Sequence, residues 1–158
     1  MQIKPAYNDI PNLRQLFIEY TSLLVELEPL FQDYLNMQDF DNEMENIAQK
    51  YAPPQGRLYI AYVDGQAAGC VALLPINEIE CEMKRLYVRP QYGRLGIGRA
   101  LAKEIICAAR EIGYKYMLLD TFPALYKAVT LYESMGFYRI PAYNSSPIEG
   151  TVYMKMDL

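Results

Sequence analysis

Residues 83–100 read MKRLYVRPQYGRLGIGRA, and they are the most informative part of the chain for its architecture. A predicted strand ends in its first half and a helix begins in its second half, with three glycines at the junction: Gly93, Gly96 and Gly98. Glycine lets the backbone turn sharply and approach a ligand closely. The first turn of a helix leaves N–H groups unpaired at the positive end of the helix dipole. The stretch therefore predicts an anion site suited to a pyrophosphate, with Arg94 and Arg99 adding charge beside it.

Other phosphate-binding loops fit this stretch less well. The Walker A pattern GxxxxGK[ST] is missing, because Arg99 and Ala100 stand where its lysine and hydroxyl residue would follow Gly98. A dinucleotide-binding fingerprint would need a glycine near Leu101, and its preceding strand would carry fewer charges. A glycine-rich turn that merely starts a helix remains the alternative.

The strand before the loop changes the phase of its alternation. Its apolar residues occupy odd positions first and even positions later: Ile79, Cys81 and Met83, then Leu86 and Val88. One inserted residue near Lys84 and Arg85 explains the shift and predicts a β-bulge. A bulge would bend the strand away from its neighbour and free backbone groups for a ligand. Alternatively, both faces of the strand are covered and the alternation carries no information.

The rest of the chain predicts a mixed α/β fold. In chain order we expect an edge strand (2–6), a helix capped by Asn8 or Asp9 that runs through Leu27, a helical stretch (39–51), three strands (57–63, 66–74 and 79–88), a helix (96–112), a strand (116–121), a helix (124–135) and two strands (137–140 and 151–158). Consecutive strands of a meander are antiparallel, whereas a strand–helix–strand crossover gives parallel pairing. The strands at 79–88 and 116–121 should therefore run parallel within a mostly antiparallel sheet.

Composition limits the functions that the chain can perform. Its 158 residues are the size of one domain, and a net charge of −4 without a basic stripe argues against a nucleic-acid partner. No apolar run is long enough to span a membrane, and the N-terminus lacks the layout of a signal peptide. Three cysteines without a CxxC pair argue against a disulfide scaffold or a zinc site. We therefore expect a cytoplasmic protein without a metal.

The chain contains no histidine. This absence excludes Ser-His-Asp and Cys-His nucleophilic systems. Any proton transfer must therefore use carboxylates, tyrosines, lysines or water.

The loop and its surroundings resemble the GNAT family of N-acetyltransferases. The motif Gly96-Ile97-Gly98 matches the second half of the family pattern Gln/Arg-x-x-Gly-x-Gly/Ala, although Gly93 occupies the first position and Arg94 comes one place late. Residues 131–137 (LYESMGF) look like the family stretch LYExxGF, and residues 83–88 look like its preceding strand. The order of elements also agrees from about residue 57 to the end. The resemblance implies one GNAT-type domain over residues 1–158, with acetyl-CoA as its cosubstrate.

The resemblance also implies an acyl-CoA N-acyltransferase fold, in which two parallel strands splay apart and the pantetheine arm lies between them. Backbone groups of Val88 would hold pantetheine, and the N–H of Leu86 would polarise the thioester carbonyl. The residues expected to bind the cofactor are Leu86, Val88, Gly93, Arg94, Leu95, Gly96, Ile97, Gly98 and Arg99. The family often has an asparagine where this chain has Leu125, so that contact is lost.

Three residues are candidates for catalysis by direct attack of an amine on the thioester. Glu82, eleven positions before Gly93, would act as the base through a water, as a carboxylate at this spacing does in some family members. The N–H of Leu86 would stabilise the oxyanion. Tyr132 matches the family tyrosine that assists the leaving thiolate. Alternatively, Glu82 lies on a solvated face of its strand and Tyr132 only packs against the sheet.

The acceptor would be a primary amine of a small molecule, a peptide or a protein. Two segments are expected near it: the acidic stretch with Asp33, Asp39, Asp41, Glu43 and Glu45, and the loop 143–147. A charge run is usually a solvated face, which is the alternative for the acidic stretch. Exposed edge strands are compatible with a homodimer. A second functional class stays open, a non-catalytic acyl-CoA-binding or regulatory module.

Overall fold

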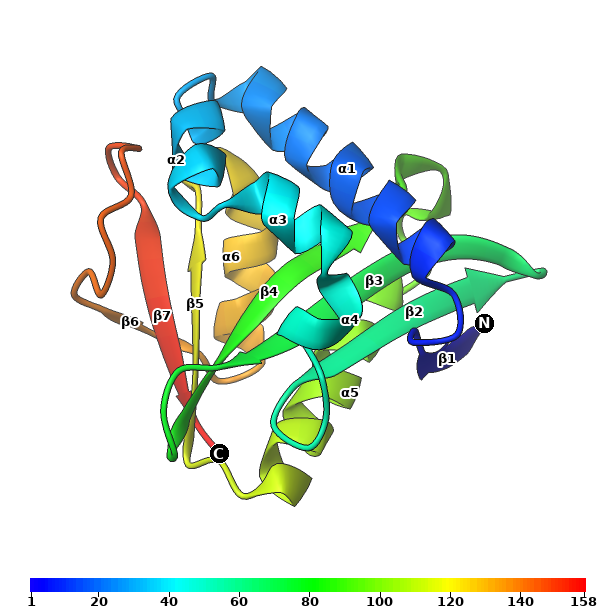
Figure 1. Ribbon diagram of the computed structural model, residues 1–158. Helices are drawn as coiled ribbons and strands as arrows, with labels where there is room; N and C mark the ends of the chain where they lie inside the picture. Colours follow the sequence, from blue (N-terminus) through cyan, green and yellow to red (C-terminus); the bar gives the residue numbers. More distant parts are fainter.

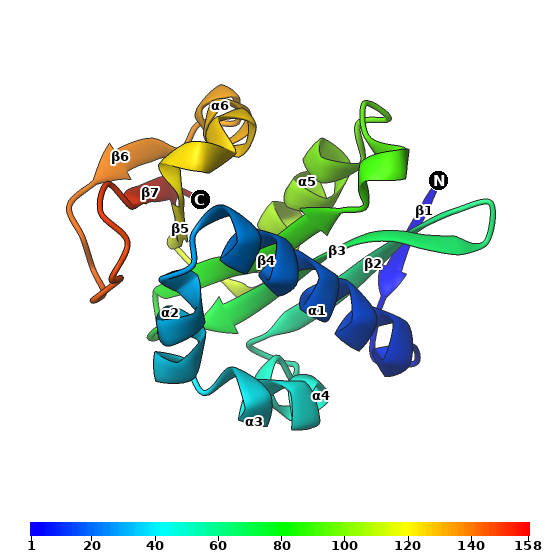
Figure 2. The ribbon, with the colours of Figure 1, turned by 90° about the horizontal axis from the view of Figure 1, so that it is seen from above.

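The computed structural model describes residues 1–158 and places one sheet between two layers of helices (Figures 1 and 2). The strands are β1 (Gln2–Pro5), β2 (Arg57–Val63), β3 (Gln66–Pro75), β4 (Glu80–Val88), β5 (Tyr116–Thr121), β6 (Tyr138–Ile140) and β7 (Val152–Asp157). The helices are α1 (Ile10–Leu27), α2 (Phe31–Met37), α3 (Phe40–Glu45), α4 (Ile47–Lys50), α5 (Ile97–Ile112) and α6 (Tyr126–Ser134), with short 3₁₀ turns η1 (Pro90–Tyr92) and η2 (Pro123–Leu125). None of these helices combines the length and the apolar character that crossing a bilayer requires.

The seven strands follow the order β1-β2-β3-β4-β5-β7-β6, and only β4 and β5 run parallel. This confirms the mixed sheet and the parallel pair predicted from the order of elements. The parallel pairing joins only residues 80–82 to residues 116–118. Beyond Glu82 the two strands diverge, and the opening between them is visible in Figure 1.

The predicted β-bulge is present in β4. The register between β3 and β4 shifts by one residue between the pairs Cys70–Tyr87 and Ala72–Lys84. Arg85, the inserted residue, has a φ of 59°, in the left-handed region that residues with a Cβ rarely adopt. The bulge therefore accounts for the change of alternation in the sequence.

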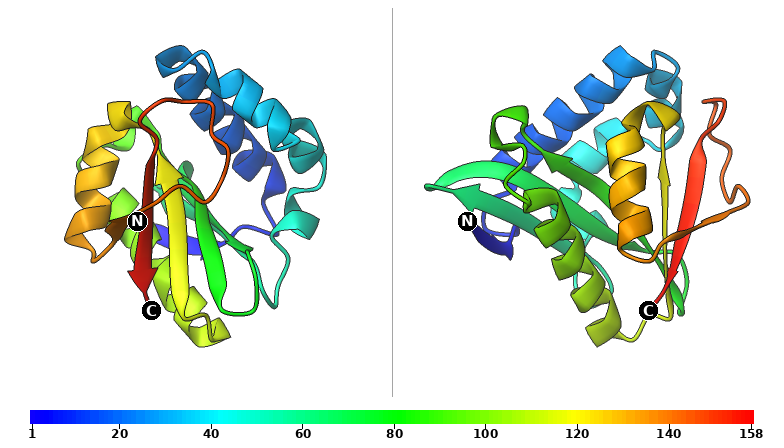
Figure 3. Two further views of the ribbon diagram at one scale, coloured as in Figure 1. Left: turned by 90° about the vertical axis from the view of Figure 1, so that its left-hand side faces the viewer. Right: turned by 180° about the vertical axis from the view of Figure 1, so that it is seen from behind.

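Each face of the sheet buries its own apolar cluster. On the face covered by α1 to α4, the cluster includes Leu13, Leu16, Phe17, Ile47, Tyr51, Leu58, Ile60 and Tyr87. On the face covered by α5 and α6, seen from behind in Figure 3, it includes Met83, Leu101, Ile105, Met117, Val129, Tyr132 and Met154. Leu86 and Val88 pack against this second cluster, on the same face as Met83. A third, smaller cluster joins α1 and α2 to the end of β5 through Leu24, Phe31, Tyr34, Leu35, Phe122 and Ile148.

The N-terminal helices differ from the prediction. The predicted stretch 39–51 is divided into α3 and α4, and α2 precedes it over residues for which the sequence pattern predicts no helix. Asp39, with a φ of 56°, separates α2 from α3, and the non-helical Asn46 separates α3 from α4. Asp9 occupies the N-cap of α1 but makes no capping bond, because its carboxylate accepts hydrogen bonds from Asn12 and Tyr62 instead.

A buried ion cluster ties α3 and α4 to the bulge. The Nε of Arg85 donates to Glu43 Oε2 at 3.1 Å, and its Nη2 donates to Glu43 Oε1 at 3.2 Å and to Gln38 Oε1 at 3.1 Å. Lys50 Nζ lies 2.6 Å from Glu43 Oε1. Burial alone would raise the pKa of Glu43, but the charges of Arg85 and Lys50 and their hydrogen bonds lower it to about 2. Glu43 is therefore a structural partner of Arg85 rather than part of a solvated acidic face.

The substitution Glu43→Gln should lower the free energy of unfolding at pH 7 by about 3–5 kcal/mol, because it leaves Arg85 buried without its counter-charge. The pKa of Glu43 is lowered from 4.5, so its stabilising effect is complete above about pH 4.5 and is lost as the pH falls toward 2. Urea unfolding of both proteins at pH 7 and pH 3 should therefore show a smaller difference at pH 3. The exposed Glu45→Gln, in the same helix, is the control and should change stability little. An equally small effect of Glu43→Gln would contradict the role of the pair.

Candidate active site

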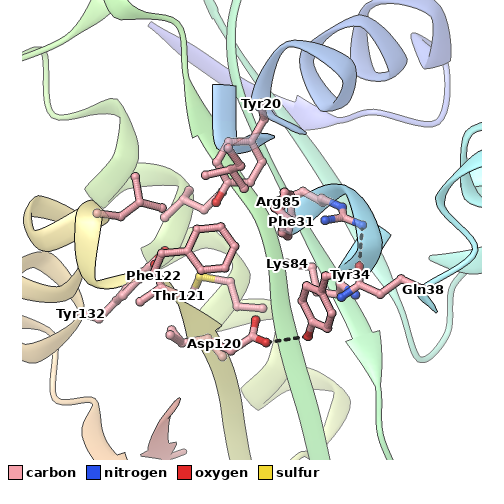
Figure 4. Close-up of a pocket in the computed structure, with 15 residues that line it drawn as sticks. Tyr20, Phe31, Tyr34, Gln38, Lys84, Arg85, Asp120, Thr121, Phe122 and Tyr132 are labelled. Atoms are coloured by element: carbon pink, nitrogen blue, oxygen red, sulfur yellow. Dashed lines mark hydrogen bonds between the residues drawn. The ribbon is translucent and has the colours of Figure 1, made fainter. Parts of the chain in front are cut away.

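Two adjoining hollows lie where β4 and β5 diverge. The inner cavity, between these strands and helices α1 and α2, is lined by Tyr20, Leu24, Phe31, Tyr34, Gln38, Met83, Lys84, Arg85, Leu86, Leu119, Asp120, Thr121, Phe122, Leu125 and Tyr132 (Figure 4). The outer groove, between the end of β4 and helix α6, is lined by Tyr20, Leu23, Leu86, Tyr87, Val88, Pro90, Gly98, Ala124, Leu125, Tyr126, Lys127, Ala128, Leu131 and Tyr132. The two hollows share four residues: Tyr20, Leu86, Leu125 and Tyr132. Two of the predicted catalytic residues, Leu86 and Tyr132, therefore stand at the junction.

The glycine-rich loop places the N-terminus of helix α5 at the outer groove. Gly96 is the N-cap of α5 with a φ of 75°, a conformation that suits glycine. The bond from Ala100 N–H to Gly96 O, at 3.0 Å, is the first of the helix, so the amides of residues 97–99 precede the helical ladder. Gly98 lines the groove, and the absence of a side chain there leaves its backbone accessible.

The other predicted loop residues have different surroundings. Gly93 already donates its amide to Pro90 O at 3.0 Å, within η1. The side chain of Arg99 donates to Ser134 Oγ at 2.7 Å, which holds it between α5 and α6, and Arg94 is exposed with a φ of 65°. Leu95 is exposed, whereas the side chain of Ile97 is buried in the core. Any contact of Leu95 or Ile97 with an anion would therefore be made by the backbone.

Tyr132 is buried, and its hydroxyl makes no hydrogen bond within the protein. Its ring packs edge-on against Phe137, with ring centres 5.7 Å apart. Burial raises the pKa of the phenol well above its usual range, and the nearby Tyr20 and Asp120 act in the same direction. Tyr132 is therefore a protonated donor with a free hydroxyl at the junction of the two hollows.

Glu82 is nearly buried but lies outside the wall of the inner cavity. Its side chain is 13% exposed and borders a shallow depression with Tyr34, Gln38 and Tyr143. Tyr143 donates a hydrogen bond to Glu82 Oε2 at 2.6 Å. Burial raises the pKa of Glu82, although the Lys84 charge and the Tyr143 hydrogen bond oppose the shift. The structure thus rejects the solvated alternative for Glu82, and a water would have to bridge it to the inner cavity.

Asp120 is a second carboxylate at the site, and the sequence analysis missed it. It stands near the end of β5 and lines the inner cavity, where it accepts a hydrogen bond from Tyr34 Oη at 2.7 Å (Figure 4). It also accepts a hydrogen bond from Asn144 Nδ2 at 2.8 Å. Asn144 belongs to the loop 143–147, which the analysis placed near the acceptor. A lone carboxylate after the apolar run 117–119, at the end of a strand predicted to splay, is the signal that could have identified Asp120.

The chain is similar to acetyltransferases of known sequence and structure. A profile of the acetyltransferase (GNAT) family matches residues 19–137. An uncharacterised N-acetyltransferase of Schizosaccharomyces pombe is 41% identical over 144 residues, which cover 85% of this chain and 88% of that protein. An acetyltransferase of Streptococcus agalactiae has the same fold, with a TM-score of 0.80 at 21% identity over 99% of this chain and 98% of that one. A GNAT acetyltransferase of Elizabethkingia anophelis with acetyl-CoA bound has a TM-score of 0.59 at 25% identity, over 75% of this chain and 85% of that one.

The substitution Tyr143→Phe should raise the pKa of Glu82 further. It removes a hydrogen bond that favours the ionised carboxylate and leaves the burial that favours the neutral acid. A carbon-13 NMR titration of the glutamate carboxyl groups would measure the shift. Tyr138→Phe, which removes the exposed hydrogen bond to Asp157, is the control and should leave the Glu82 titration in place. An unchanged or lower pKa in Tyr143→Phe would contradict the assigned hydrogen bond.

Proposed function

Because the chain belongs to the GNAT family of acetyltransferases, we propose that it moves the acetyl group of acetyl-CoA to a primary amine by direct attack in a ternary complex. One observation carries the proposal. The divergence of β4 from β5 joins a groove that begins at a helix N-terminus to a cavity that contains a carboxylate, with Leu86 and Tyr132 between them. A donor with a phosphate-bearing tail and a small amine acceptor would meet at this junction.

The outer groove has the parts that acetyl-CoA requires. The amides of residues 94–99 offer donors for its pyrophosphate, and Arg94 and Arg99 add positive charge at the same end. The apolar walls formed by Val88, Ala128 and Leu131 suit the pantetheine arm. In this arrangement the thioester lies near Leu86, which has no register partner on β3 because of the bulge. All of these parts come from residues 1–158, which we propose to act as one domain.

Residues of both hollows take part in the proposed reaction. A carboxylate accepts the proton of the amine: Glu82 through a bridging water, with Asp120 lining the cavity beside it. The neutral nitrogen attacks the thioester carbon, and the Leu86 N–H stabilises the developing oxyanion. The carbon–sulfur bond then breaks as the nitrogen loses its second proton and the amide forms, and uptake of one proton converts the departing thiolate to the CoA thiol. Tyr132 donates a hydrogen bond to the departing sulfur, and its raised pKa favours such donation over complete loss of its proton.

A non-catalytic acyl-CoA-binding module is the alternative of a different class. The buried carboxylate of Glu82 and the free hydroxyl of Tyr132 favour the enzyme, because binding of the cofactor alone needs neither group. We also propose a cytoplasmic location, since Cys70, Cys81 and Cys107 are free thiols. Cys107 is exposed and not a core residue, so a reducing compartment would protect it from oxidation.

The substitutions Glu82→Gln and Tyr132→Phe should lower kcat while the affinity for acetyl-CoA stays within about threefold. We expect a loss of roughly 100-fold or more for Glu82→Gln, the usual size of a general-base effect, and about tenfold for Tyr132→Phe. Release of the CoA thiol in a screen of primary amines measures turnover, and calorimetry measures affinity. Tyr138→Phe is the control for loss of an exposed tyrosine hydroxyl. Acetyl-CoA binding without turnover of any amine would support the non-catalytic module instead.

The substitution Gly98→Val should weaken acetyl-CoA binding by roughly tenfold or more without unfolding the protein. A Cβ at this position would lie 3.8 Å from Val88 Cγ2 and 3.9 Å from Leu131 Cδ2, which are ordinary contacts, but the larger side chain would occupy the groove. Lys103→Val places the same residue on an exposed position of α5 and should leave the affinity unchanged. Calorimetric titration distinguishes the two variants, and equal affinities would exclude the groove as the cofactor site.

A further inference from the structure

Lys84 carries a nearly buried ammonium group that has no hydrogen-bond partner in the protein. Its side chain is 12% exposed and lines the inner cavity. The nearest carboxylate oxygen, Glu82 Oε1, is 3.9 Å away, too far for a hydrogen bond. The β-bulge explains why Lys84 has no hydrogen-bonded carboxylate. It places both Lys84 and Arg85 at the cavity, and the carboxylate of Glu43 pairs with Arg85.

The other charged groups around Lys84 have partners of their own. Glu43 is held by Arg85 and Lys50, Glu82 accepts from Tyr143, and Asp120 accepts from Tyr34 and Asn144. Burial lowers the pKa of Lys84 to about 8, and the charge of Arg85 adds to this effect. An apolar side chain of the same length would be cheaper to bury at this position. The only ionic neighbour of the Lys84 ammonium is Glu82, in a long ion pair, and Glu82 also accepts the hydrogen bond from Tyr143, so the ammonium has room for an anionic group supplied by a ligand.

The other residues that line the inner cavity indicate the chemistry of the rest of that ligand. Asp120 lies on β5, across the opening from Lys84 on β4, and offers a negative charge (Figure 4). Aromatic rings fill much of the surface between them: Tyr20, Phe31, Tyr34 and Phe122. A molecule with a carboxylate, an ammonium and an apolar side chain matches the three kinds of wall. A polyamine matches poorly, because its second cation would meet Lys84.

We propose that Lys84 binds the carboxylate of the acceptor, and that the acceptor is an α-amino acid with an apolar or aromatic side chain. Asp120 holds its ammonium group near Leu86, and the aromatic rings that line the inner cavity contact its side chain. The inference rests on the proposed acetyl transfer to an amine and names the class of that amine. Lys84 acts here as a specificity-determining residue and not as the base.

Three matched acceptors test the inference: phenylalanine, phenylalaninamide and 2-phenylethylamine, which share a ring and an amine and differ in the carboxylate. Steady-state kinetics with acetyl-CoA should give the highest kcat/KM for phenylalanine. In Lys84→Met, the ratio of kcat/KM for phenylalanine to that for 2-phenylethylamine should fall by ~10- to 100-fold, the usual effect of a hydrogen bond to a charged group. Lys84→Arg should restore part of the ratio. Lys103→Met, on the exposed face of α5, should leave the ratio as in the wild type.

Different results overturn the inference and the proposed function. Equal or better use of 2-phenylethylamine by the wild-type protein, or an equal loss for all three acceptors in Lys84→Met, overturns the role of Lys84 while acetyl transfer stands. If none of the three is acetylated, calorimetric titration of phenylalanine into the protein saturated with CoA decides. If phenylalanine binds to the wild-type protein and does not bind to Lys84→Met, the anion subsite is supported. The claim that phenylalanine is acetylated is then the only part that is overturned. No binding at millimolar phenylalanine overturns the subsite.

Discussion

The buried pair between Arg85 and Glu43 is the interaction on which the site depends. Arg85 holds an unfavourable left-handed backbone conformation, and its two hydrogen bonds to Glu43 hold the side chain against helix α3. The inserted residue turns β4 as it leaves β5, so the sheet opens there instead of continuing. It also leaves Leu86 without a partner on β3. Leu86, next to the bulge, is one of the four residues that line both the outer groove and the inner cavity.

The N-terminal helices therefore have two connected roles. Helix α3 supplies Glu43, which is the counter-charge of Arg85 in the bulge, and helix α4 supplies Lys50, which also pairs with Glu43. Helices α1 and α2 supply the aromatic wall of the inner cavity, including Tyr20 and Tyr34. A change of sequence in this region would alter the inner cavity directly and the geometry of β4 indirectly. The outer groove depends on them less, because most of its lining comes from the end of β4 and from α6, and α1 contributes only Tyr20 and Leu23.

The strands, the parallel pair, the bulge and the glycine-rich helix start could all be predicted, because each leaves a local pattern of alternation or a turn residue. The division of residues 31–50 into three short helices could not, since it depends on the backbone of Asp39 and Asn46 in the folded chain. The acidic stretch predicts either a border of the acceptor site or a solvated face, because no local signal indicates that Arg85, 42 residues away, lies opposite Glu43. Asp120 does leave a local signal, but its hydrogen-bond partners do not, since they come from α2 and the loop before β7. Long-range pairing of charges is the information that the sequence alone does not contain.

The central claim is that the groove between the end of β4 and helix α6 binds acetyl-CoA. The most direct test is the melting temperature of the purified protein against increasing acetyl-CoA, with ATP and NAD as control ligands. At a hundred times the dissociation constant, binding should stabilise the fold by about 2.7 kcal/mol and raise the Tm by roughly 5–10 °C. A rise with acetyl-CoA that ATP and NAD do not reproduce is the result we expect. No rise, or an equal rise with ATP, would contradict the assignment of the groove.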